Sequence, residues 1–87
     1  MAGTNTFFAL MAEYNHAIIG VKDCAEKFGL SPKVAMERAN KQALPIPCFR
    51  LEESQKAPMY IHVQDLANWI DSRREAANEL WKKVNSA

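Results

Sequence analysis

The sequence predicts one mainly α-helical domain, residues 1–87, with a small β-hairpin, and two patterns lead to this prediction. Four stretches have apolar residues at helical spacing: 5–14, 21–28, 32–42 and 63–84. Two short apolar runs then flank a polar loop, as in a hairpin: 48–51 and 59–62. A hydrophobic content of 48% in 87 residues is enough for one packed core and argues against disorder.

The first helix is expected over residues 5–14, where Phe7, Leu10 and Tyr14 recur at helical spacing. A short apolar strand is expected next, over residues 16–20. Neither element carries residues typical of a catalytic or binding motif, so we expect both to build the core.

Residues 21–43 predict a helix-turn-helix, because each residue of the turn suits its position. Gly29 can take the left-handed conformation that ends the first helix. Ser31 can cap the second helix, and Pro32 fits its first position, where a missing N–H costs nothing. The second helix has a small-residue stripe expected to face the other helices: Ala35, Ala39 and Ala43. This pattern is typical of a DNA-binding helix-turn-helix.

A β-hairpin is expected over residues 48–62, because two prolines end the preceding helix and a polar loop separates the two strands. Gln55 and Lys56 would be at the tip of this loop. A helix-turn-helix followed by a hairpin is a winged helix-turn-helix, and the loop would be its wing.

The last helix is expected over residues 63–84. Its apolar seam alternates steps of four and three residues, the spacing of a coiled coil: Leu66, Ile70, Arg73, Ala77, Leu80 and Val84. So small a domain cannot bury the full length of this helix. We expect a dimer through its C-terminal half, at Ala77, Leu80, Trp81 and Val84, because an exposed apolar patch calls for a partner. The alternative is a solvated tail.

The net charge of +1 is weak evidence on nucleic-acid binding and counts slightly against it, but residues 31–62 carry five basic against three acidic residues. The candidate DNA contacts on the second helix of the motif are Ser31, Lys33, Val34, Glu37, Arg38 and Lys41, and those in the hairpin are Arg50, Gln55 and Lys56. Arg38 could pair with guanine N7 and O6. Arg50 could instead pair with Glu52 or Asp65, and each of the others could be an ordinary exposed polar residue.

The sequence offers no enzyme signature. His16 and His62 are isolated, and no glycine-rich phosphate loop is present. Cys24 and Cys48 are too far apart for a CxxC motif, so we expect both to be buried thiols in a reducing compartment. No apolar run approaches the ~20 residues of a membrane span, and no secretory signal is recognisable. We therefore expect a cytoplasmic protein without catalytic residues, cofactor or metal.

Two segments, Ser54-Gln55-Lys56-Ala57 and His62-x-Gln64-Asp65-Leu66-Ala67, are specific signals within a longer similarity over residues 7–77. On these residues the chain resembles the pyocin activator family, PrtN-like transcriptional regulators of phages and phage-tail bacteriocin clusters. More distantly the order of its elements is similar to AlpA-like activators and excisionases, small winged-helix proteins with a MerR-like arrangement, so the resemblance implies a MerR-like and excisionase-like winged helix-turn-helix. The resemblance implies a sequence-specific DNA-binding activator of phage or bacteriocin genes in a bacterial host, with double-stranded DNA and host RNA polymerase as partners.

Two other functions stay open from the sequence. An excisionase-like factor would bend DNA during recombination instead of recruiting polymerase. A phage protein-interaction module would bind a host protein through its apolar C-terminal helix, and the low net charge favours this alternative.

Overall fold

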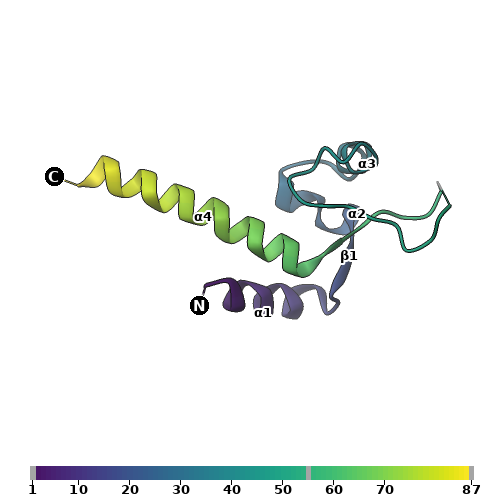
Figure 1. The fold of residues 1–87 in the computed structure, drawn as a ribbon, viewed down its shortest axis with the longest axis horizontal. Coiled ribbons are helices and arrows are strands. Elements are labelled where there is room, and N and C mark those ends of the chain that lie inside the picture. Colours follow the sequence, from purple (N-terminus) through teal and green to yellow (C-terminus); the bar gives the residue numbers. More distant parts are fainter. Residues whose placement is uncertain (1, 55, 87) are drawn as a thin grey trace.

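The computed structural model describes residues 2–54 and 56–86. In chain order the elements are α1 (Ala2–Tyr14), β1 (Ile18–Gly20), α2 (Val21–Cys24), the 3-10 helix η1 (Ala25–Phe28), α3 (Pro32–Asn40), β2 (Tyr60–His62) and α4 (Val63–Asn85) (Figure 1). The described chain is mostly helical, with two antiparallel strands and a long C-terminal helix. The predicted fold class, a winged helix-turn-helix with a long last helix, is therefore confirmed.

The turn of the helix-turn-helix has the predicted chemistry. Gly29 has a φ of 71° and ends η1, with its N–H donating to the carbonyl of Glu26 at 3.0 Å. The Ser31 hydroxyl caps α3 by accepting the N–H of Val34 at 3.3 Å, and Pro32 is the first residue of that helix. The helix before the turn differs from the prediction, because its second half is the tighter helix η1.

Helix α3 ends at Asn40, two residues earlier than predicted, and this changes the alanine stripe. Ala35 and Ala39 are fully buried, but Ala43 lies beyond the end of the helix and is exposed. The chain reverses at Gln42, whose φ is 53°. The Gln42 side-chain amide then donates to the carbonyl of Cys48 at 2.8 Å and accepts the N–H of Cys48 at 3.2 Å. These bonds hold the connection to the wing against the end of α3.

Strand β2 pairs along its length with β1, and not, as predicted, with a strand over residues 48–51. The register aligns Ile19 with Ile61 and Gly20 with Tyr60. Only Phe49 from the predicted strand pairs, through two bonds of 2.9 and 2.7 Å to Tyr60. Alternate residues of an antiparallel strand point their backbone groups to opposite sides, so the next pairing positions are residues 47 and 51. Residue 47 is a proline without an N–H, and the chain bends from residue 51, so pairing stops after one residue. The wing projects from this bridge (Figure 1).

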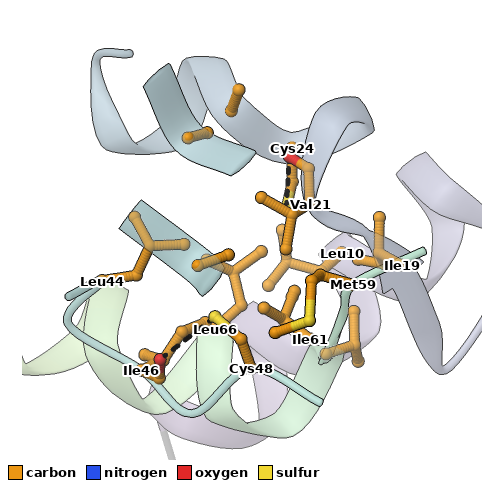
Figure 2. Packing of buried hydrophobic residues seen from close by; sticks show 14 of the residues in the cluster. Leu10, Ile19, Val21, Cys24, Leu44, Ile46, Cys48, Met59, Ile61 and Leu66 are labelled. Carbon is orange, nitrogen blue, oxygen red and sulfur yellow. Dashed lines mark hydrogen bonds between the residues drawn. The ribbon is translucent and has the colours of Figure 1, made fainter. Parts of the chain in front are cut away.

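The core lies where the helix-turn-helix, the sheet and the start of α4 meet (Figure 2). Its largest fully buried side chains are Met59, Ile61, Leu66, Val21, Val63 and Cys24. Cys24 and Cys48 are free and buried, as predicted. Burial raises the pKa of the Cys24 thiol to about 11 and also raises the pKa of Cys48.

Helix α1 lies along the first half of α4 (Figure 1), and the Thr6 hydroxyl donates to the Asp71 carboxylate at 2.6 Å. Helix α1 begins at Ala2, earlier than the predicted residue 5. From Ser72 to Ser86 every residue of the chain is exposed. None of the helices in the described ranges is both long enough and apolar enough to cross a membrane.

Candidate nucleic-acid interface

Helix α3 presents its polar face outward because its alanine face is buried. Ala35 and Ala39 have no exposed surface, so the helix backbone lies close against the core. Four of the predicted contacts have exposed side chains: Lys33, Glu37, Arg38 and Lys41, the last of them at the C-terminal cap. Val34 is half-buried, and the exposed residue Ser31 caps the start of the helix. All six predicted residues of this segment therefore reach the surface, around the outward side of α3.

The basic side chains of this surface are free of salt bridges. Within residues 2–54 and 56–86, the ion pairs are Lys27 with Glu13 at 3.0 Å and Lys82 with Glu79 at 3.9 Å. Lys33, Arg38 and Lys41 take part in neither pair. Their charges are therefore available to a phosphate, which is the main source of affinity in protein–DNA binding.

Arg50 joins the wing to the end of α3. Its Nε donates to the carbonyl of Ala57 at 3.2 Å, and its Nη2 donates to Asn40 Oδ1 at 2.7 Å. The sequence offered Glu52 or Asp65 as partners, but neither is bonded to Arg50. A guanidinium has five N–H donors, so Arg50 can make both bonds and still present donors to a ligand.

A groove of about 410 Å³ separates the start of α2 from the wing, with α3 along its side. Its polar lining comes from three parts of the chain: Lys22, Asp23, Asn40, Arg50, Lys56 and Tyr60. Three of these residues are basic and one is acidic, so the groove has a positive charge and suits a negatively charged ligand such as a sugar–phosphate backbone. Its form follows from the bonds that attach the wing to the body, including those of Arg50.

Lys22 was not among the predicted contacts. It is exposed and lies in α2, the first helix of the motif, opposite the wing across the groove. From the sequence alone it is one more charged residue of the helix that precedes α3. Only the folded position of the wing relative to α2 brings Lys22 into the same groove as Arg50 and Lys56.

The wing loop is partly described. Gln55 lies outside the described residues. Lys56 is exposed, and its N–H donates to the Ser54 hydroxyl at 3.1 Å, while the N–H of Ala57 donates to the Ser54 carbonyl at 3.1 Å. These two bonds close the loop and hold Lys56 at its projecting end.

The four residues predicted for dimerisation lie far from this groove. Ala77, Leu80, Trp81 and Val84 are all in the exposed part of α4, and Leu80, Trp81 and Val84 are 64%, 63% and 75% exposed. Figure 1 shows the wing and the C-terminal end of α4 at opposite ends of the molecule. A partner could therefore cover one surface without blocking the other.

No cluster of three or more His, Cys, Asp or Glu residues that could hold a metal ion occurs in the part of the chain that the structure describes. Residues 6–77 match the family profile described as "Pyocin activator protein PrtN". The matched range includes the helix-turn-helix, the groove, the wing and the first half of α4. No curated protein and no solved structure matched the chain.

Proposed function

This chain belongs to the pyocin activator family, a family of pyocin-gene regulators and not of enzymes, and we propose that it acts by binding DNA sequence-specifically as a transcriptional activator. The observation that carries this proposal is the outward polar face of α3. The exposed basic residues Lys33 and Arg38 of this helix, and Lys41 at its C-terminal cap, take part in no salt bridge among the described residues, so their charges can meet DNA when the helix enters a major groove.

The residues of α3 and the wing take different roles in this proposal. Arg38 reads a guanine through its N7 and O6, a contact worth about 1–3 kcal/mol of discrimination. Glu37 and Val34 lie beside Arg38 in the major groove of the DNA, where the Glu37 carboxylate can accept a hydrogen bond from cytosine N4. Ser31, Lys33 and Lys41 bind phosphates or base edges at the two ends of the helix.

The groove beside α3 holds the DNA backbone. Lys22, Arg50 and Lys56 supply three positive charges around it. Gln55, which the sequence places in the wing loop, is proposed to contact an adjacent phosphate or the minor groove. Each contact of this kind positions the protein without reading sequence.

Dimerisation and recruitment complete the proposal. Ala77, Leu80, Trp81 and Val84 join two copies, so that two α3 helices address two half-sites. An activator in the bacterial cytoplasm also needs a surface for host RNA polymerase, and this contact is part of the proposed function.

The test is binding to DNA from the promoter and attachment site that accompany the gene, at several salt concentrations. The variant is Lys33→Ala/Arg38→Ala, and the matched control is Lys27→Ala/Lys82→Ala, which removes two positive charges that are paired elsewhere. We expect the first variant to lower the salt slope by about 0.9, because Lys33 is the phosphate contact of the pair. We expect it to lose affinity at least tenfold, because it also loses the Arg38 contact to guanine, worth about 1–3 kcal/mol. The control should bind like the wild type.

Three outcomes would count against the proposal. Unchanged binding by the Lys33/Arg38 variant would refute the role of α3. Failure of the wild type to bind either DNA would favour the protein-interaction module. Preferential binding and bending of the attachment site, without promoter activation, would favour the excisionase-like factor.

A further inference from the structure

The C-terminal half of α4 carries an apolar seam that nothing in the described chain covers. The seam positions Arg73, Ala77, Leu80 and Val84 are spaced by four, three and four residues, so they lie along one side of the helix. All four are exposed. The earlier seam residue Leu66 is instead fully buried in the core. The seam available to another molecule therefore begins at Arg73.

This free seam is short. From Arg73 to Val84 the helix rises ~17 Å, enough for four layers of side chains between two helices. A stable protein interface buries at least ~1,200 Å² in total, and four layers with one alanine and one arginine fall at the low end of this range. The seam therefore suits a weak, reversible contact with one other helix of similar length.

A second copy aligned in parallel would fit this seam poorly. Each seam residue would then meet its own equivalent, so two Arg73 side chains would face each other in one layer. The next layer would hold two Ala77 side chains and leave a gap. Like charges in close contact and an unfilled layer both oppose association.

A second copy aligned antiparallel fits better. Arg73 then faces Val84 of the other helix, and its aliphatic stem can cover that valine while the guanidinium reaches solvent. Ala77 faces Leu80 in the two central layers, so that a small residue meets a large one. Arg74, which flanks the seam, then lies near Trp81 of the other copy, where a cation–π contact can form.

We propose that α4 binds the same segment of a second copy in antiparallel orientation, with Ala77 opposite Leu80 and Arg73 opposite Val84. This rests on the dimer of the proposed function and assigns its geometry. The centre of the pair is then between residues 78 and 79, and the two Val63 residues lie ~46 Å apart along the helices. Because α3 is at the same end of α4 as Val63 (Figure 1), the two reading helices are farther apart than the ~34–36 Å of one DNA turn.

Cysteine cross-linking tests the orientation. Two variants are prepared, Ala77→Cys and Leu80→Cys, with tags of different size, and each is oxidised alone and in an equal mixture. The antiparallel pair brings residue 77 within disulfide reach of residue 80 of the other copy and offsets identical positions by ~4.5 Å along the helix. We expect the mixed product to exceed either single-variant product at least tenfold. The native thiols are buried, so the wild type should remain uncross-linked.

Two results would overturn the proposal. If each variant alone cross-links at least as much as the mixture, the two helices are parallel. No cross-linking in any sample, on protein whose circular dichroism shows an intact fold, would show that the tails do not associate. Neither result affects the test of α3, because the Lys33/Arg38 variant is measured on DNA in a chain with an unaltered tail.

Discussion

Replacing Arg50 by lysine separates its charge from its structural bonds. The arginine spans two acceptors, the carbonyl of Ala57 in the wing at 3.2 Å and Asn40 Oδ1 at the end of α3 at 2.7 Å. A lysine ammonium keeps the charge but lacks the planar fork that reaches both acceptors. Arg50→Lys should therefore loosen the wing and leave the electrostatics of the groove unchanged.

The expected magnitude follows from the exposure of the two bonds. Hydrogen bonds from a charged donor contribute about 1.5–3 kcal/mol each, and solvent reduces this value for the exposed bond to Asn40. We take about 2 kcal/mol for both bonds together, so Arg50→Ala loses about 2 kcal/mol and Arg50→Lys about 1 kcal/mol. In a domain of 87 residues these losses lower Tm by roughly 10 and 5 °C.

Thermal unfolding followed by circular dichroism, with DNA titrations at several salt concentrations, measures both effects. Arg50→Ala should also lower the salt slope by about 0.9, and Arg50→Lys should keep it. The matched control is Lys56→Ala, on the same loop, which should lower the slope by about 0.9 and leave Tm unchanged. If Arg50→Lys melts at the wild-type temperature, Arg50 does not hold the wing and the reasoning is wrong.

Three further predictions concern local structure and pH. Gly29→Ala should cost about 1 kcal/mol in urea unfolding, because φ is 71° there while space for a Cβ is open; a cost near zero would contradict the strain. His62→Ala should cost about 1 kcal/mol and His62→Asn much less, because His62 Nδ1 caps α4 by accepting the N–H of Gln64 at 2.9 Å; equal losses in the two variants would exclude the cap. Stability should fall as pH rises from about 9 to 12, because burial raises the pKa of Cys24 from 9.0 to about 11 and that of Tyr14 from 10.0 to about 12. Over this range the unfolded chain releases protons that the folded chain keeps. A urea midpoint that rises with pH here would refute the prediction.

Features that depend on neighbouring residues were predictable from the sequence. The left-handed Gly29, the Ser31 cap and the first-turn proline of α3 each act within four residues of the chain. Helical spacing also predicted the buried Ala35 and Ala39 and the exposed side chains of Lys33, Glu37 and Arg38. These interactions are local, so their geometry follows once the helix forms.

Features that join distant segments were not predictable. The pairing of β2 with β1, and with only Phe49 of the predicted strand, joins segments that are far apart in the chain. The side chain of Gln42, where the chain reverses, bonds to the backbone of Cys48. The exposure of Ala43 depends on the same reversal of the chain. No pattern in the sequence shows that a glutamine after a helix will bond to a residue six positions later.

The sequence by itself therefore determined the helix-turn-helix, the long last helix and the exposed polar face of α3, because capping, turn geometry and helical periodicity operate over a few residues. Only the tertiary structure decided that Arg50 bonds to Asn40 and Ala57, and that Lys22 faces Lys56 across a groove. It also decided where on α4 the buried seam ends and the exposed seam begins. Each of these depends on how segments tens of residues apart pack against one core, and such packing follows from the whole chain.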